Sequence, residues 1–202
     1  MPTAIVPEHQ PLAPGPSWAL FETAIGLCGI AWGPRGLVGV QLPEESLVAT
    51  QARMLRRWPE GLESDPPAEV RQVINGIRAL LSGEPADLST APLDLGAVPP
   101  FHRRVYEITR GIRAGETLTY GGVAARLGEP GSARAVGQAL GRNPFAVVVP
   151  CHRVVAAGGR PGGFSAAGGV ITKLRLLEIE RAGPGGQPSL FSDFPAPAAD
   201  RG

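Results

Sequence analysis

The adjacent residues Pro99 and Pro100 divide the chain into two parts, the first with patterns of both strands and helices and the second with patterns mainly of helices. This division constrains the fold more than any other feature. A proline donates no backbone hydrogen bond and restricts the residue before it, so neither a helix nor a central strand continues through the pair. Before it, short apolar stretches are separated by Gly and Pro. These stretches predict three strands of a small antiparallel sheet, over residues 18–21, 25–32 and 37–42.

Helices are expected on both sides of this division. Before it, apolar residues at helical spacing predict helices over residues 44–58 and 67–81. After it, residues 101–112 have the same period and begin directly behind a proline, which favours the first turn of a helix. The fold class that follows is α+β, with the small antiparallel sheet and its helices first and a mainly helical part second.

The same patterns predict how the chain is divided into domains. We expect an N-terminal α/β domain over residues 17–98 and a C-terminal domain over residues 99–183. Five prolines and no regular period predict that residues 1–16 form a mobile arm, and the Gly/Pro-rich residues 184–202 are expected to be a disordered tail.

A helix-turn-helix pattern follows in the second part. Thr119 can cap a helix that runs to Leu127, residues 128–131 form a turn, and Ser132 can cap a second helix that ends near Gly141. Arg134 lies in the first turn of this second helix, which is rich in Ala and Gly and can therefore approach a DNA groove closely. The alternative is a packed pair of helices without DNA contact.

Charge is sorted along the chain although the net charge is only +1. Residues 1–100 carry 6 Arg against 11 acidic residues, whereas residues 101–181 carry 11 Arg and one Lys against 5 acidic residues. The second excess is typical of a domain that binds nucleic acid, and it also occurs on ordinary solvated surfaces.

Composition excludes several classes of protein. Two Cys and three His offer neither a disulfide scaffold nor an obvious zinc site, so we expect free thiols, no metal and no cofactor. No apolar run approaches the about 20 residues of a membrane-spanning helix, and the N-terminus has no signal pattern. A cytoplasmic protein without membrane contact is expected.

The most informative stretch is Pro150-Cys151-His152-Arg153-Val154, which follows the β-prone apolar residues 145–149. A Cys on a proline-bounded turn beside a His and an Arg can be held as a thiolate and act as a nucleophile. The alternative is a buried structural Cys, the commoner fate of an isolated Cys among apolar residues.

Taken together, these residues resemble the O6-alkylguanine-DNA alkyltransferases, also called methylated-DNA–protein-cysteine methyltransferases, in their stand-alone form. The resemblance covers residues 99–181 continuously, whereas the N-terminal part matches only in size and in its order of strands and helices. It is carried by PFHRRVY at 100–106, GETLTY at 115–120, ARAVG at 133–137, RNP at 142–144, PCHRV at 150–154, GFS at 163–165 and a helix over 173–180.

The resemblance implies the chemistry of the site. Cys151 would take the alkyl group from O6-alkylguanine, or O4-alkylthymine, in double-stranded DNA, irreversibly and once per molecule. His152 would deprotonate the thiol through a water, and Glu180, rather than Glu178, would orient His152. The family also implies an RNase H-like N-terminal domain and a winged-helix-like C-terminal domain.

The resemblance also implies how the damaged base is reached. The nucleotide must leave the duplex, with Arg134 filling the gap and Ala133 and Gly137 on the same helix against the DNA. Tyr120 would rotate the target phosphate and donate a proton to the base. Asn143 would join the recognition helix to the active-site segment.

The alkylguanine pocket is expected to comprise Pro150, Val154, Phe164 and Ser165. Ser165 would bond the lesion oxygen, and the carbonyls of Cys151 and Val154 would read the guanine amino group. Phe164 stands where some relatives have Tyr, and residues 166–172 form a longer segment than in some relatives, so the pocket can differ in width.

The tail contains Gln187-Pro188-Ser189-Leu190-Phe191, which resembles a peptide that binds the bacterial sliding clamp. Gln187, Leu190 and Phe191 would make that contact in an otherwise monomeric protein, and the alternative is a tail that folds back on the body. Two rival functions remain open at this point. One is a DNA-binding module with a structural or sensing Cys151, and the other is a Cys–His hydrolase with multiple turnover.

Overall fold

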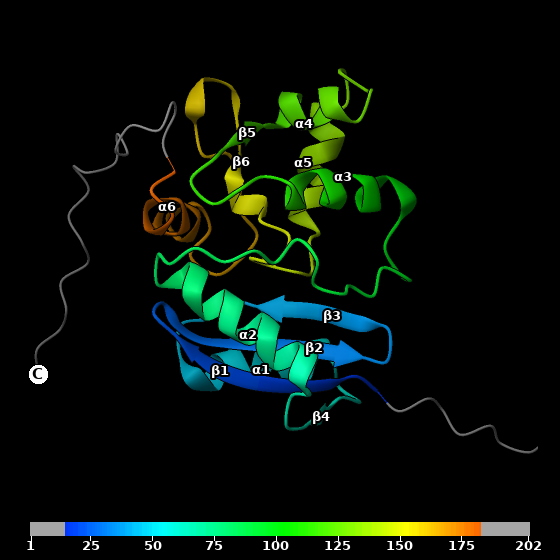
Figure 1. Cartoon of the computed structure of the whole chain (residues 1–202), viewed down its shortest axis with the longest axis vertical. Helices are drawn as coiled ribbons and strands as arrows, with labels where there is room; N and C mark the ends of the chain where they lie inside the picture. Colours follow the sequence, from blue (N-terminus) through cyan, green and yellow to red (C-terminus); the bar gives the residue numbers. More distant parts are fainter. Residues whose placement is uncertain (1–14, 183–202) are drawn as a thin grey trace, which may run out of the picture.

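The computed structural model describes residues 15–182, and its first half is built on a four-stranded sheet (Figure 1). The strands β1 (Ser17–Thr23), β2 (Gly26–Gly33) and β3 (Gly36–Gln41) form an antiparallel meander, as predicted. A short β4 (Leu62–Glu63) pairs in parallel with the start of β1, which gives the order β3-β2-β1-β4. The sequence did not predict β4, because two exposed residues carry no period.

Two helices cover opposite faces of this sheet (Figure 1). In a strand, successive side chains point to opposite faces. Trp18 of β1 packs with Met54 of α1 (Leu47–Arg57), whereas Phe21 belongs to the main core together with Ile77 of α2 (Ala68–Leu81). The alternation along β1 therefore serves two helices, one on each face.

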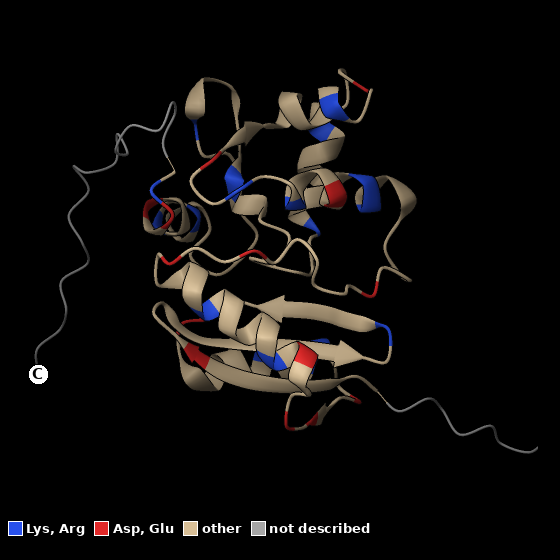
Figure 2. Ribbon diagram, in the orientation of Figure 1, with Lys and Arg blue, Asp and Glu red and all other residues tan. Residues whose placement is uncertain are grey.

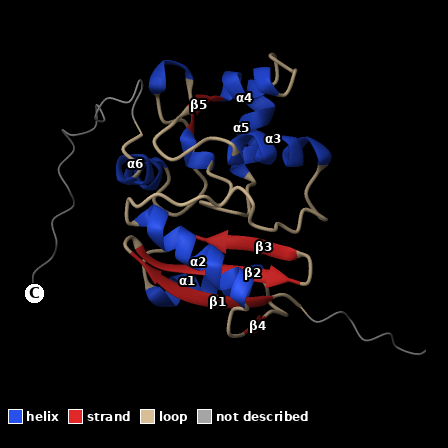
Figure 3. Ribbon diagram, viewed as in Figure 1, coloured by secondary structure: helices blue, strands red, loops and turns tan. Residues whose placement is uncertain are grey.

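The second half is mainly helical (Figure 3). It comprises α3 (Pro100–Arg110), α4 (Tyr120–Arg126), α5 (Ala133–Gly141) and α6 (Val170–Ile179). A two-stranded parallel ladder joins β5 (Leu118–Thr119) to β6 (Val154–Val155), and the short 3-10 helices η1 (Cys151–Arg153) and η2 (Ala157–Gly159) flank β6. The α+β class and the helix pair α4–α5 are thereby confirmed.

Of the two predicted helix caps, one is present and the other is wrong. The Thr119 hydroxyl accepts a hydrogen bond from Gly122 N at 2.9 Å and caps α4. Ser132 precedes α5 but makes no such bond, because its backbone is not extended (ψ 16°) and its hydroxyl instead donates to Glu129 O at 2.8 Å. The Ser132 side chain therefore closes the turn before α5 rather than capping the helix.

The β-prone residues 145–149 do not form a strand. Phe145 makes a single bridge with Val40 of β3, where Val40 N donates to Pro144 O at 2.8 Å. The chain then turns at Val147, whose φ of 69° is incompatible with an extended strand. The apolar run reflects burial in the core and not pairing in a sheet.

The outer edge of β3 carries the backbone hydrogen bond between the two halves, from Val40 N to Pro144 O. On the same edge, but within the first half, Leu37 N donates to Pro92 O at 2.8 Å and Asp94 N donates to Leu37 O at 2.7 Å. One hydrophobic cluster runs from the strands through α2 into α3, α5 and α6. The division into domains at Pro99 stays a prediction, and both the expected tail and nearly all of the expected arm lie outside the described residues.

Within residues 15–182, no helix is both long and apolar enough to cross a membrane.

We expect Thr119→Ala to lower the free energy of unfolding by about 1 kcal/mol, because it removes an N-cap. Ser132→Ala is expected to cost less than half as much, because that hydroxyl caps no helix, and Thr119→Ser is expected to keep most of the stability. Urea unfolding followed by circular dichroism measures all three. Equal losses for Thr119→Ala and Ser132→Ala would contradict the assignment.

Candidate active site

Two tight turns carry the chain to Cys151. Val148 N donates to Ala146 O at 2.9 Å across Val147, and Cys151 N donates to Val149 O at 2.8 Å across Pro150. Pro150, with φ −78° and ψ 66°, is the centre of an inverse γ-turn, whereas the positive φ of Val147 belongs to the rare, strained form. A β-branched residue held there costs of order 1–3 kcal/mol. The surrounding core therefore enforces the path of this segment.

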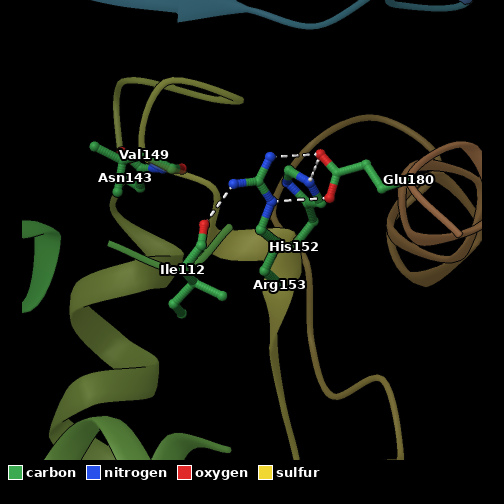
Figure 4. A network of polar contacts seen from close by, with 6 residues as sticks. All are labelled: Ile112, Asn143, Val149, His152, Arg153 and Glu180. Carbon is green, nitrogen blue, oxygen red and sulfur yellow. Dashed lines mark hydrogen bonds and ion pairs between the residues drawn. The ribbon is translucent and has the colours of Figure 1, made fainter. Parts of the chain in front are cut away.

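Asn143 closes the segment with both ends of its amide. Its Nδ2 donates to Val149 O at 2.8 Å, and its Oδ1 accepts from Phe145 N at 2.9 Å. Figure 4 shows the Asn143 side chain beside Val149. The amide thus fixes the residues that immediately follow α5 and immediately precede Cys151, as the hinge prediction requires; the part Asn143 plays in the reaction stays a prediction.

His152 and Glu180 meet in the interior. The distance between His152 Nε2 and Glu180 Oε1 is 3.0 Å, and their side chains are only 1% and 5% exposed. A carboxylate can only accept, so Nε2 carries the proton and Nδ1 keeps a free lone pair. Within the described residues this Nδ1 is buried and has no partner, which leaves it available to accept a proton. Glu178 is exposed, so the carboxylate that reaches His152 is Glu180.

Arg153 binds both oxygens of the same carboxylate (Figure 4). Its Nε and Nη2 donate to the two oxygens of Glu180 at 2.8 and 2.7 Å, and its Nη1 donates to Ile112 O at 2.6 Å. Two-pronged binding of this kind fixes orientation as well as charge. The sequence reasoning placed Arg153 beside Cys151 as a charge that could help to hold a thiolate, and it did not predict that Arg153 binds Glu180.

These contacts determine the charge of Glu180. Burial alone would raise its pKa, but the hydrogen bonds and charges of His152 and Arg153 outweigh it and lower the pKa from 4.5 to about 2. The group is therefore a carboxylate at neutral pH. It can stabilise the positive charge that forms when His152 takes a proton.

The environment of Cys151 favours the neutral thiol in the resting state. Burial raises its pKa, while the side chain of Asn143 and the positive charge of Lys173 act in the opposite direction. Cys28, the other free thiol, lies buried in β2 with a pKa raised to about 12 by burial. Only Cys151 has a base, a cation and a cavity beside it.

Lys173 is the single lysine of the chain and its side chain is fully buried. Its Nζ donates to Val154 O at 2.6 Å and lies 5.6 Å from the centre of the Tyr120 ring. Burial lowers its pKa to about 8. The sequence reasoning used Lys173 only to align the last helix; one lysine among 18 arginines, in an apolar helix, was the signal that it overlooked.

A cavity of about 750 Å³ lies between α5 and the segment that follows β6. Arg134, in the first turn of α5, is exposed at its rim and makes no ion pair within residues 15–182, and Figure 2 shows further basic residues on the neighbouring helices. The walls of this cavity bring together many of the predicted site residues: Tyr120, Ala133, Arg134, Gly137, Cys151, Phe164 and Ser165.

Other predicted pocket residues lie elsewhere. Pro150 lines a separate cavity, behind the active-site segment. The Val154 side chain is fully buried, and its carbonyl already accepts a hydrogen bond from Lys173. Among the described residues, no cluster of His, Cys, Asp or Glu could hold a metal ion.

Comparison with known proteins places this arrangement in a family. Residues 100–182 match the model described as "6-O-methylguanine DNA methyltransferase, DNA binding domain". Over 159 residues, the chain is 38% identical to the methylated-DNA–protein-cysteine methyltransferase of Methanothermobacter thermautotrophicus, covering 79% of this chain and 82% of that protein. The chain belongs to the methylated-DNA–protein-cysteine methyltransferase family.

Other members agree along most of their length. The methyltransferase of Mycobacterium tuberculosis H37Rv is 36% identical over 162 residues, which cover 79% of this chain and 93% of the relative. The crystal structure of Mycobacterium tuberculosis OGT in complex with DNA aligns with a TM-score of 0.65 and 33% identity over 84% of this chain and 96% of that one. The O6-methylguanine-DNA methyltransferase of Pyrococcus kodakaraensis KOD1 aligns with a TM-score of 0.61 at 29% identity, over 81% and 98%.

We expect Glu180→Gln to flatten the dependence of stability on acid pH in this methyltransferase. Because the pKa of Glu180 is lowered in the folded state, from 4.5 to about 2, its contribution is present above pH 4.5 and is lost as pH falls toward 2. The shift corresponds to about 3 kcal/mol. Urea unfolding from neutral pH to about pH 3 measures the slope. Glu178→Gln, an exposed carboxylate at the same end of α6, is the control that keeps the wild-type slope.

We expect Lys173→Met to raise the pKa of Cys151, because the thiolate loses a buried cation. A rise of one unit lowers the thiolate fraction at neutral pH about tenfold. The measurement is the pH dependence of Cys151 alkylation by iodoacetamide, read from the Cys151 peptide so that Cys28 does not contribute. Arg175→Met removes an exposed cation from the same helix and should leave the profile in place. An unshifted profile in Lys173→Met would show that Lys173 does not act on the thiol.

Proposed function

We propose that this protein repairs DNA by transferring the alkyl group of O6-alkylguanine, and of O4-alkylthymine, to Cys151 in a single, irreversible reaction. The observation that carries the proposal is the position of Cys151. Cys151 lines the cavity beside α5, and the next residue, His152, belongs to a buried set of hydrogen bonds with Glu180 and Arg153. A structural Cys needs neither a base nor a cavity.

The reaction begins with the loss of the thiol proton. His152 takes it at Nδ1 through an intervening water, and Glu180 stabilises the resulting imidazolium. The thiolate attacks the alkyl carbon; the S–C bond forms as the bond between that carbon and O6 breaks, and guanine leaves with the electron pair. The leaving base gains one proton, which we assign to the Tyr120 hydroxyl that lines the same cavity. No step of the proposed mechanism breaks the S–C bond of the thioether, so Cys151 is not regenerated and one molecule repairs one lesion.

Access to the base requires extrusion of the nucleotide. Double-stranded DNA docks on α5, where the small side chains of Ala133 and Gly137 permit close approach. Arg134, exposed in the first turn, enters the duplex in place of the extruded base, because a planar guanidinium stacks between bases and donates to the orphaned partner. Asn143 couples this helix to the active-site segment.

Recognition of the lesion uses the far wall of the cavity. Ser165 donates to the lesion oxygen, and Phe164 stacks on the base. The carbonyls of Cys151 and Val154 accept from the guanine amino group; the Val154 carbonyl has a second lone pair besides the one that Lys173 uses.

The proposed protein acts as a monomer in the cytoplasm, because this chemistry needs one active site and one DNA duplex. The predicted sliding-clamp peptide with Gln187, Leu190 and Phe191 lies outside the described residues.

The deciding experiment incubates the protein with a duplex that carries one O6-methylguanine and measures the intact mass. We expect a gain of one methyl group per protein, saturating at one equivalent under excess substrate and located on the Cys151 peptide. Cys151→Ser is expected to bind DNA without gaining mass, and Cys28→Ser to react as the wild type does.

Two results would overturn the proposal. DNA binding without a mass gain would favour the DNA-binding module with a structural or sensing Cys. Release of many product molecules per protein would favour the Cys–His hydrolase.

A further inference from the structure

A second cavity, of about 210 Å³, extends from the thiol toward the N-terminal half. It shares Cys151 and Ser165 with the larger cavity. Its remaining walls include Arg53 and Arg57 of α1 and Arg142, the residue that follows α5. We refer to this space, which reaches from Cys151 to these three arginines, as the arginine pocket.

The arginine pocket carries an excess of positive charge. Its acidic residue is Glu44, whose carboxylate already accepts from Gln41 Nε2 at 3.0 Å and lies 3.8 Å from Arg53 Nε. Within residues 15–182, neither Arg57 nor Arg142 has a carboxylate within 4.0 Å. Two arginines that line the same cavity as the thiol are thus without a carboxylate partner among the described residues.

Arg57 is held in place rather than free in solvent. Its guanidinium donates to Pro144 O at 3.1 Å and lies 4.5 Å from the centre of the Trp58 ring. Burial lowers the pKa of Arg57, and repulsion from the nearby positive charge of Arg53 lowers it further. An anion that enters the pocket relieves this repulsion, and a fixed guanidinium binds a carboxylate with little further loss of freedom.

The direction of the alkyl group points the same way. In the proposed reaction the Cys151 sulfur attacks the carbon opposite its bond to O6, so any further atoms on that carbon lie to the side of the S–C–O6 line, against the cavity walls next to Cys151 and Ser165. Cys151 and Ser165 both line the arginine pocket. A methyl group has no such further atoms, whereas a longer substituent has atoms that can enter the arginine pocket.

We propose that the arginine pocket selects O6-alkyl groups that end in a carboxylate, of which carboxymethyl is the smallest. This inference rests on the proposed function and names its substrate class. The thiolate attacks the methylene carbon, an S–C bond forms, the bond to O6 breaks with its electron pair on guanine, and the protein retains S-carboxymethylcysteine at position 151. The arginines offset the repulsion between the two anions, thiolate and carboxylate, during this approach.

A DNA phosphate is the other anion that three arginines could bind. The adduct is favoured because Cys151 itself lines the pocket and its volume is about 210 Å³, which suits a small substituent better than a length of backbone. The two sources differ in a measurable way. Loss of a phosphate contact slows every substrate alike, whereas loss of a carboxylate contact slows only the acidic adduct.

The test compares single-lesion duplexes that carry O6-carboxymethylguanine or its neutral counterpart of equal size, O6-carbamoylmethylguanine. Rate constants are measured at single turnover, with adduct masses as identification. We expect the wild type to react faster with the acidic adduct. In Arg142→Gln the ratio of acidic to neutral rate constants is expected to fall about fivefold, the upper range for one exposed charge pair, and further in Arg53→Gln/Arg142→Gln. Arg175→Gln, an exposed arginine outside the pocket, should keep the ratio.

Four outcomes would overturn the proposal. An unchanged ratio in both pocket variants would show that the arginines do not recognise the carboxylate. Equal slowing of both substrates would assign the arginines to DNA phosphates. Transfer of methyl but not of carboxymethyl would refute the role of the arginine pocket and leave the proposed function standing. No transfer from O6-methylguanine either would refute both proposals.

Discussion

The carboxylate of Glu180, shared between His152 and Arg153, is the interaction on which the rest of the site depends. It joins the end of α6 to η1, and Arg153 extends the connection to the backbone at Ile112, just beyond α3. Segments distant in sequence therefore meet at one buried charge. An isolated buried carboxylate would be protonated, but two donors keep it ionised, and in that form it holds the proton of His152 on Nε2, the nitrogen that faces Glu180.

Around this charge, the polypeptide is shaped by constraints that come from both halves of the molecule. Val40 at the edge of β3 donates to Pro144 O, and the Asn143 amide bonds the backbone of Phe145 and of Val149. The strained turn at Val147 persists because these contacts leave the chain no other path. The N-terminal sheet, which contributes nothing to the larger cavity, in this way positions the nucleophile.

Much of this could be predicted from the sequence, for identifiable reasons. The strands β1–β3 are bounded by glycines in turns, and the helices have apolar periods that a single sequence displays. The run at residues 145–149 misled, because a buried segment in turns has the same composition as a buried strand. Motif resemblance singled out Cys151, His152 and Glu180, but the pairing of Arg153 with Glu180 and the burial of Lys173 depend on contacts between segments that no local pattern encodes.

The buried ammonium of Lys173 has a consequence for the protein after it has reacted. Before transfer, a thiolate at Cys151 raises the pKa of Lys173 and shares the cost of keeping its charge away from water. A thioether carries no charge, and it adds an alkyl group to Cys151, which is only 8% exposed and belongs to the main core. In the reacted molecule no thiolate can form beside Lys173, and the added alkyl group must be accommodated against the packed core, where extra atoms are expected to cost about 1–3 kcal/mol of the free energy of unfolding.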